Sequence, residues 1–87
     1  MEKYSLTFRK SVAKDLRVIP DKDVESILAS IGSLANNPRP PGCVKLTGQE
    51  HYRIRQGNYR IVYEITDREL TVIIIKVAHR RDVYRQG

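Results

Sequence analysis

The spacing of hydrophobic and polar residues changes along the first third of the chain, and each spacing predicts a different element. Residues 3–8 alternate between polar and apolar side chains, which predicts a strand. Apolar residues then recur at helical spacing in residues 10–19 and again in residues 21–34, and Pro20 separates the two runs. We therefore expect two amphipathic helices, the second of them capped by Asp21.

The second half of the chain has the period of strands. Residues 43–46 predict a short strand, and residues 51–65 alternate on both sides of Gly57-Asn58, a dipeptide typical of a two-residue hairpin turn. After the next turn, residues 70–78 are almost continuously apolar, which is typical of a strand inside a sheet. The pattern predicts an α+β fold: strand, helix, helix, then three to four strands in a mainly antiparallel sheet, with both helices packed on one face.

The length of 87 residues predicts one domain, residues 1–87. Cys43 is the only cysteine, which excludes an internal disulfide and a Cys-based metal site. With only two histidines besides, we expect no metal site and no cofactor. The sequence shows no signal peptide and no apolar run near the ~18 residues of a membrane span, so we expect a cytoplasmic protein without membrane association.

Strand alternation assigns the side chains of the hairpin to two faces. Folding residues 51–65 about the Gly57 turn places Arg55 directly opposite Arg60, and Arg53 lies two residues away on the same face. The other face collects tyrosines and isoleucines and matches the apolar stripes of the two helices. Like charges directly opposite each other destabilise a strand pair, so the arginines need a separate explanation.

A two-residue turn at 67–68 would extend this basic face onto the last strand. In that register Ile75 lies beside Arg60, and the face continues through Val77 to His79. An anion among the arginines would convert their repulsion into shared attraction, because guanidinium groups stay charged and bind phosphate in a bidentate fork. The alternative is a solvated basic face without a ligand.

The overall charge favours an anionic partner. The net charge is +6, and ten of the 16 basic residues are arginine. Nucleic acid is the first candidate, and a general contribution to solubility is the alternative. No carboxylate pair, phosphate loop or Ser/His/Asp set stands out, but preorganised cations could cut RNA because its own 2′-OH can be the nucleophile. His79 is then best suited to proton transfer, unless it is a surface histidine at a strand end.

Three runs, taken in order, resemble a known family. They are KLTG (45–48), YRIRQGNYRIVYEI (52–65) and VIIIKVAHRRDVYR (72–85). Together they resemble the RelE-type toxins of the RelE/ParE toxin–antitoxin superfamily, over essentially the whole chain. The resemblance implies a toxin that enters the ribosome, cuts the mRNA codon in the A site, leaves a 2′,3′-cyclic phosphate and so inhibits translation. It also implies a cognate RelB-like antitoxin that covers this face.

The resemblance also assigns roles to individual residues. Arg60 would contact the phosphate and the transition state, and Arg80 would act as an acid or stabilise the leaving group. Tyr84 would stack on a base or orient the nucleophile. Contacts with RNA phosphates are expected from four further basic residues: Arg53, Arg55, Arg81 and Lys45. Two departures are visible, since the hairpin pair is lysine in the best-known members and the short tail leaves little room for a C-terminal helix.

Two other functions fit the same residues. A ParE-like toxin that inhibits DNA gyrase without nuclease activity has the same fold, but it has no need of the arginine and tyrosine set. A non-catalytic RNA-binding module would bind RNA in a salt-sensitive way and would not cut it. Assays of RNA cleavage and of gyrase supercoiling separate the three functions.

Overall fold

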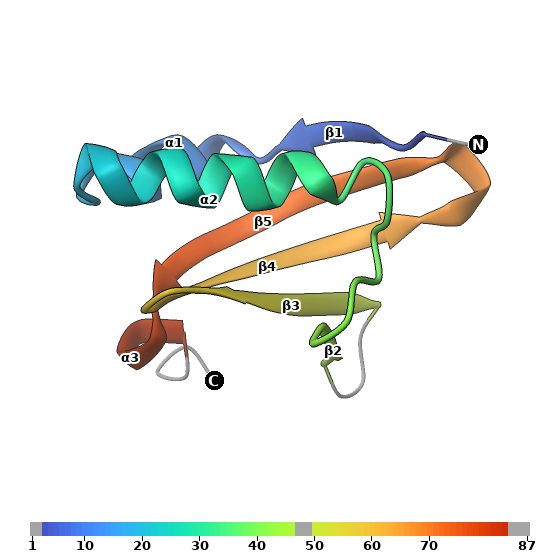
Figure 1. Ribbon diagram of the computed structural model, residues 1–87. Coiled ribbons are helices and arrows are strands. Elements are labelled where there is room, and N and C mark those ends of the chain that lie inside the picture. Colours follow the sequence, from blue (N-terminus) through green and yellow to red (C-terminus); the bar gives the residue numbers. More distant parts are fainter. Residues whose placement is uncertain (1–2, 47–49, 84–87) are drawn as a thin grey trace.

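The computed structural model describes residues 3–46 and 50–83 of the chain (Figure 1). A strand and two helices come first, four strands follow, and a one-turn helix ends the described part. The elements are β1 (Ser5–Phe8), α1 (Lys10–Arg17), α2 (Asp21–Ser33), β2 (Val44–Lys45), β3 (His51–Gln56), β4 (Tyr59–Thr66), the 3-10 turn η1 (Asp67–Glu69), β5 (Thr71–His79) and α3 (Arg80–Val83). None of the helices in these ranges is long and apolar enough to cross a membrane.

The five strands form one mixed sheet in the order β1-β5-β4-β3-β2. β1 runs parallel to β5, and the other neighbouring strands are antiparallel. The predicted fold class is confirmed, with all four C-terminal strands present. β5 lies between β1 and β4, which is the interior position that its apolar sequence predicted.

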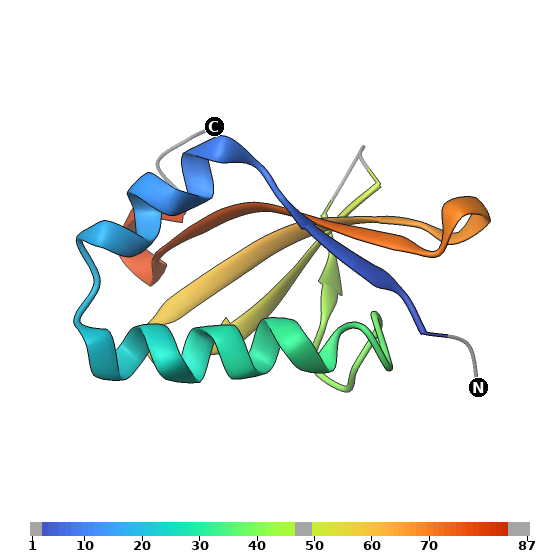
Figure 2. The ribbon, with the colours of Figure 1, turned by 90° about the horizontal axis from the view of Figure 1, so that it is seen from above.

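Both long helices cover the same face of the sheet (Figure 1, Figure 2). α1 packs on β5, and α2 packs on β3 and β4. Burial of apolar side chains between these layers supplies the main stabilising term of the fold, at about 25 cal/mol per Å². The largest fully buried side chains belong to this layer: Val12, Ile27, Ile31, Leu34, Ile61, Tyr63, Val72, Ile74 and Val77.

The start of α2 differs from the prediction. Pro20 is the N-cap, with φ −55° and ψ 142°, and Asp21 is the first helical residue, so the predicted Asp21 cap is wrong. The proline ring fixes φ near this value, which lets the chain enter the helix without strain. Asp21 and Asp23 lie instead in the first turn, where the helix dipole favours negative charge.

The pairing of β4 with β5 also differs from the predicted register. The chain turns through η1 rather than through two residues, and Leu70 closes this turn with a left-handed φ of 49°. A β-bulge then interrupts the ladder, so that Tyr63 pairs with Ile74 but its neighbour Val62 pairs with Lys76. The extra residue reverses which side chains of β5 face the helices from this point on.

The bulge turns Val77 into the core and Lys76 out of it. Val77 is 2% exposed, whereas Lys76 lies opposite Val62 on the face away from the helices. β1 has already ended at this point of β5, and the amide of Val77 donates a hydrogen bond to Asp15 Oδ2 of α1 at 3.0 Å. Asp15 therefore satisfies a backbone donor for which β1 offers no acceptor.

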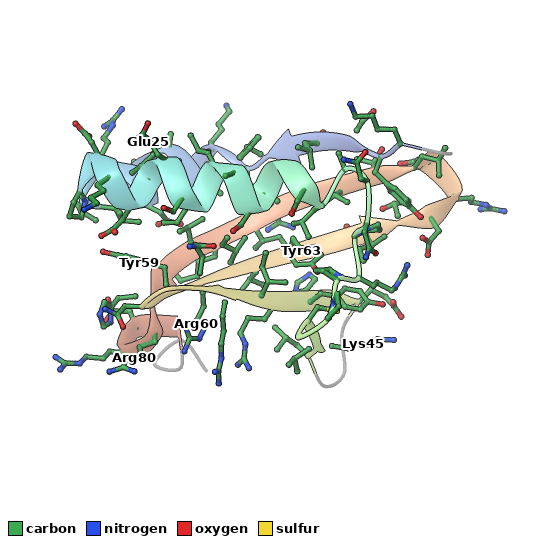
Figure 3. The ribbon with its side chains drawn as sticks, viewed as in Figure 1. Glu25, Lys45, Tyr59, Arg60, Tyr63 and Arg80 are labelled. Carbon is green, nitrogen blue, oxygen red and sulfur yellow. The ribbon has the colours of Figure 1, made fainter. Side chains whose placement is uncertain are left out.

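We expect Asp15→Ala to lower the free energy of unfolding by about 1–3 kcal/mol, because the partly buried amide of Val77 loses its acceptor. Urea denaturation measures this change. Glu25→Ala is the matched control, because Glu25 is exposed on α2 (Figure 3) and should change stability by less than about 0.5 kcal/mol. Equal effects of the two substitutions would show that the Asp15 contact does not stabilise the fold.

A second consequence of the bulge concerns the residues near Arg60. Arg60 pairs with Ala78 rather than with Ile75, and His79 pairs with Tyr59. Residues paired across antiparallel strands share a face, so His79 lies with Tyr59 on the side of the helices. The prediction that the basic face continues through Val77 to His79 is therefore wrong, because an unforeseen bulge shifts the strand by one residue.

The connector between α2 and β2 holds the end of the sheet that lies away from the hairpin turn. Arg39 donates hydrogen bonds to both carboxylate oxygens of Asp67, at 3.2 and 2.9 Å, and Tyr4 donates to the same carboxylate at 2.7 Å. Tyr63 donates to the carbonyl of Pro38 at 2.7 Å. The hydrogen bonds from Arg39 and Tyr4 hold the pKa of Asp67 below its ordinary value.

The contribution of Asp67 to stability should therefore disappear in acid. A pKa lowered by folding means a contribution that is present above the pKa of an unfolded aspartate, about 3.9, and is lost as the pH falls through the lower folded value. The difference in unfolding free energy between the wild type and Asp67→Asn should be largest near neutral pH and shrink below about pH 4. A difference that stays constant through this range would contradict the prediction.

Candidate nucleic-acid interface

Three arginines gather at the hairpin end of the sheet, on the face that the long helices leave uncovered. Arg55 pairs with Arg60 and Arg53 pairs with Val62, so the hairpin register predicted from the sequence is confirmed. Figure 3 shows Arg60 on the side of the sheet away from α1 and α2. We term Arg53, Arg55 and Arg60 the arginine surface.

Arg60 is buried more deeply than is usual for an arginine, with 7% of the residue exposed. Its Nη1 donates hydrogen bonds to the carbonyls of Gly57 and Tyr59, at 3.2 and 3.0 Å. Its Nε is buried without an acceptor among the described residues, and none of their carboxylates pairs with the guanidinium. A buried charge without a counter-ion is costly, so a bound anion would stabilise this arrangement.

The hairpin turn fixes both this guanidinium and the start of α3. Gly57 has a φ of 60°, a left-handed conformation that glycine adopts without steric cost. Its carbonyl accepts from Arg60, and the carbonyl of Asn58 accepts from the amide of Arg80 at 2.7 Å. One turn thus anchors two arginines from distant parts of the sequence.

α3 carries Arg80 and Arg81, and both residues are exposed. Arg80 lies at the same end of the sheet as Arg60, below it in Figure 3. The sequence suggested little room for a C-terminal helix, yet one turn forms directly after β5. Tyr84, also predicted to belong to the site, lies outside the described residues.

Lys76 belongs to the same face, although it was not among the predicted site residues. The bulge places it across from Val62, which in turn pairs with Arg53, so the three residues form one row across β3, β4 and β5. A single charged residue inside an apolar strand is a sequence signal for this placement, because only a register that turns Lys76 outward avoids burying its charge. The bulge makes that register compatible with a buried Val77.

A histidine–glutamate pair borders the arginine surface. His51 lies opposite Glu64, on the same face of the sheet as the arginine surface, with 3.4 Å between Nε2 and Oε1. His51 is two residues from Arg53, about 7 Å along the strand. This pair was not among the predicted site residues, although the predicted hairpin register already contains it. The carboxylate makes this border less favourable for phosphate than the turn end, where Arg60 lies.

His79 lies across the sheet from the arginine surface. Its ring meets the ring of Tyr59 edge-on, with the centroids 5.7 Å apart and an interplanar angle of 81°. Its Nδ1 accepts a hydrogen bond from the amide of Arg81 at 3.3 Å. The sheet separates the imidazole from any phosphate bound beside Arg60, so the placement does not favour the expected proton transfer.

A groove of about 510 Å³ opens beside His79, between α1 and the end of β5. Its charged lining includes Asp15, Asp82 and Lys76. The two carboxylates, Asp15 and Asp82, do not favour an RNA backbone here. The arginine surface therefore offers RNA the better electrostatic match.

Lys45 lies near the opposite end of β3 from Arg60 (Figure 3). It pairs with Tyr52, whose side faces the helices, and its Nζ is 3.5 Å from Oε1 of Glu50. The structure thus separates Lys45 from the arginine surface. Elsewhere in the described ranges, no three His, Cys, Asp or Glu side chains come together in a way that could hold a metal ion.

Comparison with known protein families finds a match over most of the chain. The model of the ParE toxin family, "ParE toxin of type II toxin-antitoxin system, parDE", matches residues 6–84. The chain belongs to this family. Within the RelE/ParE superfamily it is a RelE-type toxin, as the sequence resemblance predicted.

Individual relatives agree with this assignment. Toxin RelG of Mycobacterium tuberculosis is 31% identical over 87 residues, which cover 95% of this toxin and 98% of RelG. The RelBE2 toxin–antitoxin complex of the same organism contains a chain with a TM-score of 0.81 and 28% identity, covering 92% of this toxin and 94% of that chain. The RelE–RelB complex of Pyrococcus horikoshii gives a TM-score of 0.81 at 27% identity, with 90% and 96% covered.

Proposed function

We propose that this RelE-type toxin is a ribosome-dependent endoribonuclease that cuts mRNA in the ribosomal A site. Arg60 is the observation that carries the proposal: a guanidinium 7% exposed, held by two carbonyls and left without a carboxylate among the described residues. An RNA phosphate supplies the missing negative charge. The relatives named RelE and RelG support this choice. So does the arginine itself, because a protein that only serves as a scaffold has no need of a buried, unpaired guanidinium.

The proposed reaction uses the substrate's own nucleophile. The 2′-oxygen attacks the adjacent phosphorus, its proton passes to a base, and the 5′-oxygen leaves with a proton, which yields a 2′,3′-cyclic phosphate. Arg60 stabilises the charge on the phosphorane, and Arg80 stabilises the leaving oxygen. Tyr84 stacks on a base, and the neighbouring cations hold the flanking phosphates: Arg53, Arg55, Arg81 and Lys76. Arginine does not lose its proton readily, so none of these arginines is the base.

Primer extension on mRNA from a translation extract tests the proposal. Added purified toxin should produce new breaks at codons in the A site, with 2′,3′-cyclic phosphate ends. The same mRNA without ribosomes should stay intact, because the ribosome positions the substrate. An extract in which translation continues and the mRNA stays intact would refute the nuclease.

One observation favours a second candidate function. The family model that matches is named for the ParE toxin of the parDE system, and ParE-like toxins include gyrase inhibitors without nuclease activity. A supercoiling assay with purified gyrase distinguishes the two. Inhibition of supercoiling without mRNA cleavage would replace the nuclease by this candidate, whereas salt-sensitive RNA binding without either effect would leave an RNA-binding module.

We also propose that a RelB-like antitoxin binds this toxin and covers the arginine surface. The solved relatives from Mycobacterium tuberculosis and Pyrococcus horikoshii are complexes with RelB-type antitoxins. An acidic antitoxin segment would neutralise Arg53, Arg55 and Arg60 in the way that RNA phosphates do. Antitoxin and mRNA would then compete for the same face.

A further inference from the structure

A single histidine joins the end of β5 to α3. His79 is the last residue of β5, and its Nδ1 accepts the amide hydrogen of Arg81, the second residue of α3. A side chain that accepts from the second helical amide, and belongs to the residue before the helix, has the geometry of an N-cap. His79 therefore caps the helix that carries Arg80 and Arg81.

Two further contacts hold the same junction. The ring of Tyr59 packs edge-on against His79, and the amide of Arg80 donates to the carbonyl of Asn58. A helix of one turn is not stable by itself, because nucleation costs more than one hydrogen bond returns. The position of α3 therefore depends on contacts from the hairpin and from His79.

The orientation of α3 matters for the proposed site. Arg80 and Arg81 are exposed, so the backbone beneath them decides which part of the arginine surface their side chains can reach. A misplacement of a catalytic group by about 1 Å can lower a rate about a hundredfold. Loss of the cap should thus be visible in the rate although His79 itself lies on the other face.

We propose that His79 is a positioning residue of the nuclease: its Nδ1 lone pair fixes α3 so that Arg80 and Arg81 reach RNA on the arginine surface, and its imidazole transfers no proton in the reaction. The proposal rests on the proposed nuclease function. It replaces the proton-transfer role that the sequence suggested for His79.

Two substitutions separate capping from proton transfer. Asparagine places an amide oxygen near the position of Nδ1 and is among the best N-cap residues, but it is no proton carrier at neutral pH. Glutamine carries the same amide one bond farther out, near Nε2, and loses the cap. His79→Asn should keep the cleavage rate within about threefold of the wild type, whereas His79→Gln should lower it about tenfold.

A double-mutant cycle tests whether His79 acts through α3. In the Arg80→Ala background, His79→Gln should lower the residual single-turnover rate by less than about threefold, because the cap no longer positions that side chain. A group that transfers a proton itself would show its full effect in both backgrounds. Equal effects in the two backgrounds, or a loss of cleavage in His79→Asn, would overturn the positioning role.

Amide hydrogen exchange of Arg81 supplies a readout that does not depend on cleavage. The amide should exchange slowly in the wild type and in His79→Asn, and faster in His79→Gln. If the wild-type toxin cuts no mRNA but Arg81 exchange differs among the three proteins as expected, the nuclease function is refuted and the capping role of His79 is supported. Active enzyme with the same Arg81 exchange in all three proteins would refute the positioning role alone.

Discussion

Arg60→Ala should lower the rate of ribosome-dependent mRNA cleavage about a hundredfold or more without unfolding the toxin. Loss of one preorganised group that stabilises transition-state charge typically has an effect of about this size. The free energy of unfolding should not fall in parallel with the cleavage rate. The reason is that the substitution also removes a buried charge that has no carboxylate partner among the described residues. Single-turnover cleavage and urea denaturation of the same preparation measure the two effects.

Two further variants show whether the effect depends on the guanidinium of Arg60 or only on the loss of a positive charge. Arg60→Lys keeps the charge but lacks the planar fork, so it should recover only part of the rate. Arg68→Ala removes an equally positive residue that is exposed in η1, away from the hairpin turn, and should cleave mRNA as the wild type does. Wild-type cleavage by Arg60→Ala would show that the arginine surface is not the active site.

The second large effect is expected at Val77, a buried residue of β5. Val77→Asp should destabilise the fold by about 4 kcal/mol or more, because Val77 is 2% exposed and a carboxylate there has no counter-ion. A loss of this size approaches the total stability of a small domain, about 5–15 kcal/mol. Thermal unfolding followed by circular dichroism measures it.

Lys76→Asp is the matched control for this substitution. Lys76 lies on the opposite face, across from Val62, so the change should alter stability by less than about 1 kcal/mol. It should instead weaken RNA binding and reduce the salt dependence of the affinity. The face of the sheet that carries the arginine surface loses one positive charge and gains a negative one. The register without a bulge predicts the reverse: a tolerant Val77 and a sensitive Lys76.

Local sequence patterns proved sufficient where one pairing rule applies. Alternation across Gly57-Asn58 predicted five of the six β3–β4 pairs, all but His51 with Glu64, because a two-residue turn leaves only one register for the hairpin. The pairing of Arg55 with Arg60 followed from this register alone. Helical spacing likewise predicted the buried stripe of α2, which includes Ile27 and Ile31.

The same rules failed where a distant contact decides the local geometry. The amide of Val77 donates to Asp15 of α1, which lies 62 residues earlier in the chain. This hydrogen bond is found beside the bulge in the pairing of β5 with β4. Alternation along the strand contains no information about that helix. The prediction therefore placed Val77 and His79 on the wrong face.

The amino-acid sequence by itself determined the class of fold, the hairpin and the one-sided placement of Arg53, Arg55 and Arg60, because these depend on neighbours within a few residues. Only the tertiary structure decided that Arg60 is buried without a carboxylate partner among the described residues, and that Arg80 is tied to the hairpin turn. It alone showed His79 as the cap of α3. Burial and capping arise from contacts between segments far apart in the chain, and a one-residue bulge is enough to change which side chains make them.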